Sequence, residues 1–254
     1  MPTEDKDGAA RLSRRVAELA GCSRREAELY IEGGWVQVDG TVVDQPGAKV
    51  LPQQAVQIAP GAKPEPVADV TLLLHKPPGY GTEGGFADRP PRPAPELLAP
   101  VHQQPGDRAP WRTVRRHFDQ VCMTPLEPAA SGLVVFSQDW RIQRKLREDA
   151  ALIEHELQVD VRGTVSPEAL QQLNRPPVID GRAMAPAKVS IARQSGGVTG
   201  LRFATKGHWP GRIAQMCDAA GLTIEAMRRI RIGRVALAGL EPGRWRYLLP
   251  HERI

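Results

Sequence analysis

Near the middle of the chain, residues 126–136 read Leu126-Glu127-Pro128-Ala129-Ala130-Ser131-Gly132-Leu133-Val134-Val135-Phe136. Residues 133–136 form a continuous apolar run, largely β-branched, which predicts a buried strand beginning after Gly132. Ahead of this strand the Glu127 carboxylate stands beside a proline, and proline cannot take part in regular strand pairing. This half of the stretch is therefore predicted to be a loop at the lip of a buried strand, where site chemistry often occurs.

The composition fits a globular protein with one large and one small domain. The chain has 254 residues, of which 41% are hydrophobic, so it can bury a sizeable core. Its formal charge is +5, a modest basic excess that by itself indicates RNA binding only weakly. Clustering is more informative, because arginines concentrate in two short runs. These are Arg14, Arg15, Arg24 and Arg25, and Arg228, Arg229, Arg231 and Arg234.

Several classes of site are disfavoured by the sequence. The three cysteines, Cys22, Cys122 and Cys217, are far apart and odd in number, which supports neither a disulfide framework nor a thiolate zinc site. The histidines are scattered without metal-ligand spacing, and Ser131 lacks a nucleophile-elbow motif. The sequence has no run of about 18 apolar residues and no signal-peptide pattern. We therefore expect a soluble, cytoplasmic monomer that binds neither a membrane nor a metal.

Residues 11–59 are predicted to form a small domain that begins with two helices. Apolar positions at helical spacing predict a first helix that ends at Gly21. Ser23 followed by Glu26 is a capping box, which predicts the start of a second helix, and Gly33 ends it. Two helices in quick succession indicate an antiparallel pair at the start of the fold.

Short strands complete this small domain. Residues 35–38 and 41–43 are predicted strands, and Asp39-Gly40 between them is a strong hairpin signal. The polar residues 1–10 are predicted to be a disordered tail. Residues 60–69, which are rich in proline, are predicted to be a semi-stiff linker to the next domain.

The N-terminal segment resembles the αL RNA-binding motif, first known from a ribosomal protein of the small subunit. The matching residues are Arg11-Leu12-Ser13, Cys22-Ser23-Arg24-Arg25-Glu26-Ala27, Ile31 and Val36-x-Val38-Asp39-Gly40. The resemblance implies that arginines near the start of the second helix contact RNA phosphates, helped by unpaired backbone N–H groups. These arginines are Arg14, Arg15, Arg24 and Arg25. Considered without the motif, they are equally typical of a solvated helix face.

Residues 70–254 are predicted to form the larger domain. Residues 70–75 are a buried strand that runs into Lys76-Pro77-Pro78-Gly79. Residues 77–110 are rich in proline and poor in apolar residues, which predicts a long, mobile surface loop, followed by a short basic helix at 111–118.

Further along, Asp139 is a predicted helix N-cap, and the helix after it turns four cations outward as a second candidate phosphate surface. These cations are Arg141, Arg144, Lys145 and Arg147. The remaining expected elements are a strand at 156–161, a helix capped by Ser166 with Pro167 at its first position, a hairpin of 188–191 with 201–204, and a helix at 212–220.

The segment around Glu127 and Gly132 resembles the signature of the RsuA/RluB/RluE/RluF family of ribosomal RNA pseudouridine synthases, Gly-Arg-Leu-Asp-x-Asp-Thr-x-Gly-Leu-Leu-Leu-Leu-Thr. Aligning Gly132-Leu133 with the family's Gly-Leu places Glu127 on its catalytic Asp. Pro125 then replaces the family's Arg, and Ala130 replaces its Thr. In the strand that matches the family's Lys-Glu-Tyr-Leu-Val-x-Val, Leu157 replaces the Tyr that packs against the target uracil.

Other motifs extend the resemblance to roughly residues 11–250. Lys76 lies in a Lys-Pro-x-Gly element like the one that opens the family's catalytic domain. The C-terminal arginine run is similar to the family's Leu-Lys-Arg-x-Arg-Ile-Gly. The helix before it matches less well, and Arg212 is a candidate to replace the missing arginine. The RNA-binding residues expected on this basis are Arg14, Arg15, Arg24, Arg25, Lys76, Arg212, Arg228, Arg229 and Arg231.

The resemblance implies an α+β fold, in which the αL domain precedes a mixed, mainly antiparallel sheet flanked by helices. It implies a structured RNA partner, ribosomal RNA, and chemistry without metal or cofactor. The family flips a uridine out of its RNA, and the Asp carboxylate detaches the base and reattaches it through carbon. Here the carboxylate is one methylene longer, and its Arg and Tyr neighbours are replaced. We predict an RNA-binding protein whose catalysis is lost or strongly reduced. The alternative is an active pseudouridine synthase that uses Glu127.

Overall fold

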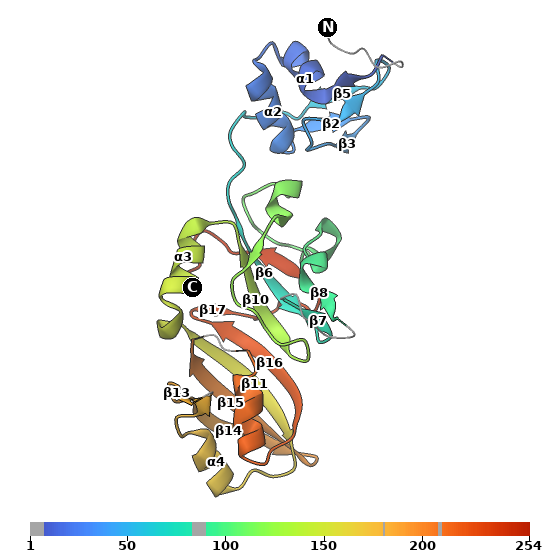
Figure 1. The fold of residues 1–254 in the computed structure, drawn as a ribbon. Coiled ribbons are helices and arrows are strands. Elements are labelled where there is room, and N and C mark those ends of the chain that lie inside the picture. The colour runs from blue at the N-terminus through green and yellow to red at the C-terminus, as the bar shows by residue number, and fades with distance from the viewer. Residues whose placement is uncertain (1–7, 83–89, 180, 208–209) are drawn as a thin grey trace. The chain divides into compact units, whose positions relative to one another are not determined.

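The chain folds into two compact units (Figure 1). The structure, a computed structural model, describes residues 8–82, 90–179, 181–207 and 210–254. Unit 1 comprises Met1–Asp69 and Pro110–Asp119, and unit 2 comprises Val70–Ala109 and Gln120–Ile254. Sequence reasoning assigned residues 110–119 to the larger domain, whereas here they group with the N-terminal residues. The other predicted domain boundaries stay predictions.

The two helices of unit 1 begin and end where local sequence rules place them. Helix α1 (Leu12–Ala20) ends at Gly21, whose φ of 62° is a left-handed conformation that glycine adopts without strain. Helix α2 (Arg24–Glu32) begins with the predicted capping box. The Ser23 hydroxyl accepts from the Glu26 N–H, and the Glu26 carboxylate accepts from the Ser23 N–H.

Short strands close the small core of unit 1. The strands are β1 (Ala10–Arg11), β2 (Val36–Val38), β3 (Thr41–Val42), β4 (Lys49–Val50) and β5 (Val56–Ile58). β2 pairs with both β3 and β5, β1 pairs with β4, and Asp39-Gly40 makes the predicted hairpin turn. Ala10 is therefore part of the folded unit rather than of the predicted tail. Residues 1–7 of that tail lie outside the described residues.

The segment Pro110–Asp119 packs tightly on the rest of unit 1. Val114 is buried and lies so close to Gly34 that a side chain at Gly34 would collide with it. The guanidinium of Arg112 lies 4.0 Å from the centre of the Trp35 ring, a cation–π contact. Unit 1 is thus built from two segments that are far apart in the sequence.

Among the described residues, a nine-stranded sheet organises unit 2. Its main path is β14-β15-β11-β16-β10-β6-β18, and every pairing in it is antiparallel except the parallel pair β10–β16. The mixed, mainly antiparallel sheet predicted from the sequence is confirmed. The strands are β6 (Thr71–Lys76), β9 (Val121–Cys122), β10 (Ser131–Ser137), β11 (Glu154–Arg162), β14 (Lys188–Ser195), β15 (Val198–Lys206), β16 (Ile224–Ile232), β17 (Val235–Ala236) and β18 (Trp245–Tyr247).

Three helices accompany this sheet in the part of unit 2 that the structure describes. α3 (Trp140–Glu148) and α4 (Pro167–Leu173) start at the predicted caps, Asp139 and Ser166. α5 (Arg212–Ala219) follows Gly211, which has no side chain to cap it. Across residues 8–82, 90–179, 181–207 and 210–254, every helix is too short or too polar to span a membrane.

The proline-rich segment contains more regular structure than predicted. β7 (Tyr80–Gly81) and β8 (Arg92–Pro93) pair in parallel, and the 3-10 turns η1 (Ala94–Leu97) and η2 (Pro100–His102) follow. Ala94, Leu97 and Leu98 are buried, so sparse apolar residues still anchor the segment. Residues 83–89 of the predicted loop lie outside the described residues. Of the helix predicted at 111–118, only the 3-10 turn η3 (Arg115–Phe118) forms. The other short elements are η4 (Ala150–Leu152), β12 (Val178–Ile179) and β13 (Arg182–Ala183).

Candidate active site

The loop that carries Glu127 spans residues 124–130 and leads into β10; we refer to it as the Glu127 loop. The Ala130 N–H donates to the Glu127 carbonyl at 3.0 Å, which closes a turn. At Gly132 the backbone of β10 passes directly against the backbone of Arg229 on β16, and a Cβ there would clash with it. Glycine at 132 is therefore required by the close approach of two parallel strands.

Lys76 is a buried cation beneath the second half of the Glu127 loop. Its ammonium group donates to the carbonyls of Ala130 (2.6 Å) and Pro128 (3.4 Å), and to two carbonyls of the segment after β6. Burial and the nearby Arg229 lower the pKa of Lys76 to about 8, while the Glu127 carboxylate partly opposes this shift. Sequence reasoning placed Lys76 among the RNA contacts, but here its side chain is fully buried.

Arg229 is a second buried cation and holds the first half of the same loop. Its guanidinium donates to the carbonyls of Thr124 (2.5 Å), Pro125 (3.1 Å) and Leu133 (2.7 Å). The residue is only 2% exposed, and burial lowers its pKa to about 10. We expected Arg229 at the surface facing phosphate; instead, Lys76 and Arg229 clamp the Glu127 loop between two interior positive charges.

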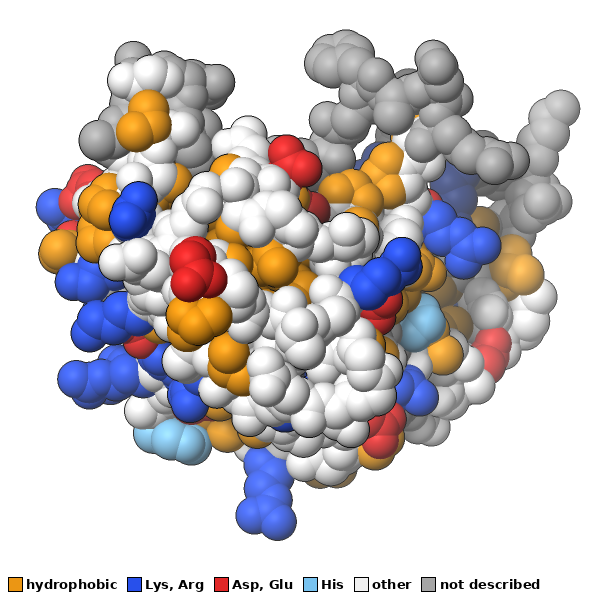
Figure 2. Space-filling view, turned by 90° about the horizontal axis from the view of Figure 1, so that it is seen from below, with side chains coloured by type: hydrophobic (Ala, Val, Ile, Leu, Met, Phe, Trp, Pro, Cys, Tyr) orange, Lys and Arg blue, Asp and Glu red, His pale blue; other side chains and the backbone are white. Residues whose placement is uncertain are grey.

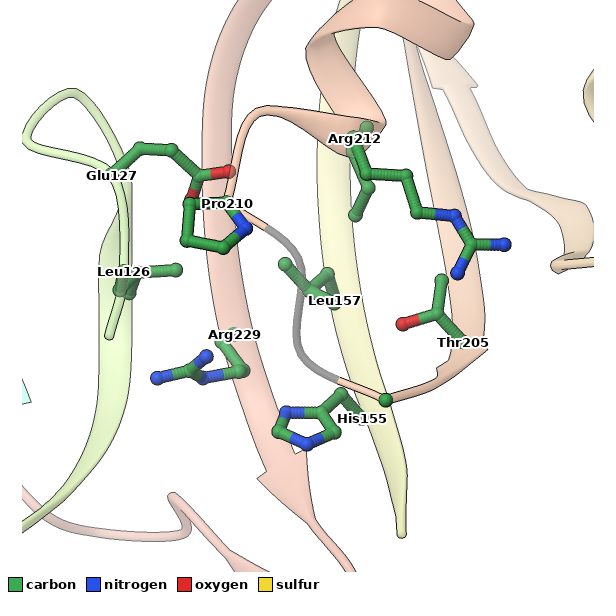
Figure 3. Close-up of a pocket in the computed structure, with 10 residues that line it drawn as sticks. Leu126, Glu127, His155, Leu157, Thr205, Pro210, Arg212 and Arg229 are labelled. Carbon is green, nitrogen blue, oxygen red and sulfur yellow. The ribbon is translucent and has the colours of Figure 1, made fainter. Parts of the chain in front are cut away.

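A small cavity adjoins Glu127 inside unit 2 (Figure 3). Its wall is formed by Leu126, Glu127, His155, Leu157, Thr205, Gly207, Pro210, Arg212, Ile213 and Arg229. The cavity volume is about 30 Å³, enough for one or two ordered waters, since a single water needs roughly 10–15 Å³ on this measure. A nucleobase is larger than this space, as it is bounded by the described residues.

The Glu127 carboxylate already has a partner in this arrangement. Its Oε1 accepts a hydrogen bond of 2.5 Å from the Gly211 N–H, and Figure 3 shows the side chain directed toward the start of α5. The contact resembles the one that glutamate makes to an N-cap N–H in a capping box, and a negative charge there complements the helix dipole. Glu127 thus serves as a cap for α5.

Arg212 does not stand beside Glu127 in place of the missing arginine. Figure 3 shows its side chain pointing away from Glu127. The guanidinium donates to the carbonyls of Ala185 and Lys206, and the residue is 3% exposed. Burial lowers its pKa. Leu157 lines the cavity, so the position that the resemblance gives to the family's Tyr does face Glu127.

Known proteins resemble this chain over nearly all of its length. Residues 11–56 match the S4 domain. An uncharacterized RNA pseudouridine synthase of Aquifex aeolicus is 24% identical over 94% of this chain and 90% of that protein. Ribosomal large subunit pseudouridine synthase B of Bacillus subtilis is 26% identical over 95% of this chain and 93% of that protein. The dual-specificity RNA pseudouridine synthase RluF of Escherichia coli is 26% identical over 98% of this chain and 78% of that protein.

A solved structure adds the fold. The crystal structure of a pseudouridylate synthase superposes with a TM-score of 0.57 at 18% identity, covering 94% of this chain and 95% of that chain. This chain is a homologue of the RsuA/RluB/RluF-type pseudouridine synthases, with an S4 domain at its N-terminus. The relationship and the fold class predicted from the motifs are confirmed.

In the S4 domain, three of the four predicted RNA-binding arginines form ion pairs on their own helices. Arg14 pairs with Glu18, and Arg24 and Arg25 both pair with Glu28. The arginine side chains remain 65–77% exposed. Such exposed pairs contribute at most about 1 kcal/mol, so a phosphate can compete for the arginines. Their assignment as RNA contacts stays a prediction.

The C-terminal arginines of this synthase homologue divide between the two faces of the sheet. Leu157 pairs with Arg229 and the preceding Glu156 with Arg231, because a β-bulge interrupts the register between them. Residues two apart normally share a face, but the extra residue at the bulge places Arg229 and Arg231 on opposite faces. Exposed positive charge is also unevenly distributed over the face of the molecule seen in Figure 2, where Lys and Arg side chains gather at the left edge of the view.

On the face away from Glu127, Arg231 and Arg202 both pair with the buried Glu156. These arginines lower the pKa of Glu156 through hydrogen bonds and charge, Arg202 most strongly. Arg228 is exposed and donates to Gln158 at 2.7 Å. Of the predicted C-terminal RNA contacts, Arg228 alone is exposed in this structure, and none of the three assignments is tested.

Sequence reasoning missed His155 and Thr205 in the cavity wall. His155 lies two residues before Leu157 on β11, so strand alternation puts both on one face and could have identified it. Thr205, on the neighbouring strand β15, pairs directly with His155. No sequence pattern predicts that Thr205 lines the cavity, because the register between β11 and β15 is set by tertiary packing.

Proposed function

We propose that this synthase homologue binds structured ribosomal RNA and that its catalytic activity is lost or strongly reduced. It acts in the cytoplasm as a monomer, without metal or cofactor. The S4 domain and its exposed arginines support RNA as the partner. Relatives named as ribosomal large subunit synthases support ribosomal RNA in particular.

The observation that carries the loss of activity is the engagement of Glu127. A nucleophile must approach the reacting atom of a base closely, and a misplacement of ~1 Å can lower the rate on the order of 100-fold. Here the side chain is one methylene longer, its carboxylate accepts a hydrogen bond from the Gly211 N–H, and it faces a cavity of about 30 Å³. Leu157 offers no aromatic ring to cover a base.

A second candidate is an active pseudouridine synthase with Glu127 as the catalytic residue. The observation that favours it is the pair of buried cations, Lys76 and Arg229, both close enough to Glu127 for their pKa values to respond to its charge. A preorganised positive environment suits a carboxylate that has to act as an anion. For turnover, Glu127 would have to leave the Gly211 N–H and the cavity would have to widen.

One experiment separates the two candidates. The purified full-length protein is incubated with unmodified ribosomal RNA in enzyme excess, and nucleosides are quantified after digestion. We expect RNA binding by filter retention and no pseudouridine above the level of Glu127→Ala. Stoichiometric pseudouridine from the wild type that is abolished in Glu127→Ala would establish the active synthase. Failure to retain RNA would contradict both candidates.

A further inference from the structure

Helix α3 of unit 2 carries an exposed aromatic side chain among exposed cations. Trp140, its first residue, is 61% exposed, and the guanidinium of Arg141 lies 5.6 Å from the centre of its ring. The helix is anchored to the core by Leu146 and by the partly buried Ile142. Figure 1 shows α3 on the outside of unit 2, beside β10. Its outer surface consists of Trp140, Arg141, Arg144, Lys145 and Arg147, and we call it the α3 surface.

The helical repeat aligns this surface. Positions i, i+4 and i+7 share one stripe of an α-helix, so Trp140, Arg144 and Arg147 lie in one row. Arg141, Lys145 and the exposed Glu148 form the neighbouring row. Among the described residues, the recorded ion pair on this surface is that of Arg144 with Glu148, at 2.8 Å. Most of its positive charge is therefore not neutralised within the helix.

Helix stability alone does not account for this arrangement. Cations in the last turn complement the helix dipole, which explains Lys145 and Arg147. Arg141, however, lies in the first turn, at the positive end of the dipole, where a cation is unfavourable and where the carboxylate of the N-cap Asp139 is engaged by the backbone N–H of Arg141 at 2.8 Å. A tryptophan with 61% of its surface in water likewise gains little from burial. Both features are explained by a ligand that brings negative charge and a flat ring.

We propose that the α3 surface binds unpaired nucleotides of RNA, with a base stacked on Trp140 and phosphates held by Arg141, Arg144, Lys145 and Arg147. Aromatic side chains interleaved with cations are the means by which proteins hold single strands without reading their sequence. The proposal rests on RNA being the partner of this protein. It adds a second contact region, in unit 2 and separate from the S4 domain.

The test measures binding of the full-length protein to two fluorescein-labelled probes, a 12-nucleotide oligouridylate and an RNA duplex of the same length, across a range of salt concentrations. In Trp140→Ala the dissociation constant for the oligouridylate should rise about 5- to 100-fold, because one stacking contact is lost. The salt dependence should stay unchanged, since tryptophan carries no charge. Binding to the duplex should change little, because its bases are not available for stacking.

A triple variant, R141Q/K145Q/R147Q, should show the opposite signature. The slope of log affinity against log salt should fall by up to about 2, since each phosphate contact on a single strand contributes roughly 0.7. The matched control, R162Q/R175Q/R193Q, removes the same charge from exposed arginines elsewhere on unit 2. Its slope should stay near that of the wild type.

The outcomes are distinguishable. A wild-type protein that binds neither probe contradicts RNA binding itself. Wild-type binding that Trp140→Ala and the α3 triple variant leave intact, or that the control triple weakens equally, overturns the role of the α3 surface alone. Because all the altered residues are exposed, the unfolding midpoint should match the wild type, and circular dichroism verifies this.

Discussion

The Oε1 atom of Glu127 accepts a hydrogen bond from the backbone N–H of Gly211, 84 residues further along the chain. Glu127 stands where the related synthases are expected to have their catalytic Asp, and Gly211 precedes the first residue of α5. Glu127 is thereby tied to the start of a helix. A substitution of Glu127 should consequently also change the stability of α5.

Glu127→Ala should destabilise the protein through α5. Loss of the cap and of the charge at the helix N-terminus should lower the free energy of unfolding by about 1 kcal/mol, whereas Glu127→Gln, which keeps an acceptor oxygen, should lower it less. Denaturant unfolding followed by circular dichroism measures the difference. Glu241→Ala, at an exposed glutamate of unit 2, is the control. Identical stabilities for Glu127→Ala and the control would show that the cap is not stabilising.

Arg229→Met should destabilise strongly, while Arg228→Met on the same strand should not. Removing the buried guanidinium leaves the carbonyls of Thr124, Pro125 and Leu133 without this donor, at a cost on the order of 3 kcal/mol. Arg228 is exposed, so its replacement should change stability by less than about 0.5 kcal/mol. Equal unfolding free energies for the two variants would refute the clamp on the Glu127 loop.

The free energy of unfolding of unit 1 should decrease as the pH is lowered, because of His117. Burial lowers the pKa of this imidazole to about 4, and neighbouring Arg116 adds to the effect, while the backbone of Ala68 and the charge of Asp69 oppose it. The imidazole is therefore protonated below pH ~6.5 in the unfolded chain, but only below about pH 4 in the folded chain. Stability should be lost progressively from pH ~6.5 to about 4, by on the order of 1–2 kcal/mol at pH 5.

The measurement is denaturant unfolding at pH 7.5 and pH 5 in the wild type and His117→Gln. The variant should be less sensitive to pH, since the titrating group is gone. His251→Gln, at an exposed histidine, should retain the full pH dependence of the wild type. A His117→Gln curve as steep as that of His251→Gln would exclude His117 as the source.

Repair of the site should require several residues together. Glu127→Asp alone should form no pseudouridine, because residues of one catalytic unit act jointly and a single repair recovers little. The triple variant P125R/E127D/L157Y should give a measurable gain over the wild type in single-turnover nucleoside analysis. Its control is P125R/E127A/L157Y, which lacks the carboxylate. Equal product from the triple variant and this control would rule out restoration.

Replacing Arg14, Arg15, Arg24 and Arg25 together with Gln should flatten the salt dependence of RNA binding. Each phosphate contact contributes up to about 0.9 to the log–log slope. As a control, Glu18→Gln with Glu28→Gln releases the arginines from their ion pairs on the helices and should leave the slope equal or steeper. An unchanged slope in the arginine variant would remove these four residues from the binding surface.

The local elements and the evolutionary relationship could be predicted from the amino-acid sequence. The Ser23–Glu26 capping box, the Asp39-Gly40 turn and the Asp139 cap each depend on residues within a few positions of one another, so their physics is complete within a short window. Motifs along the chain likewise sufficed for the S4 domain and the α+β synthase fold.

Which charged residues are interior depends on long-range contacts that the sequence does not reveal. Lys76 and Arg229 look like surface cations in sequence, but they are buried because loop carbonyls from distant segments converge on them. The bulge opposite Glu156 puts Arg231 on the other face from Arg229, and a bulge is a property of paired strands, not of one strand. The same holds for residues 110–119, whose packing on unit 1 and cation–π contact with Trp35 arise from long-range contacts that no local pattern encodes.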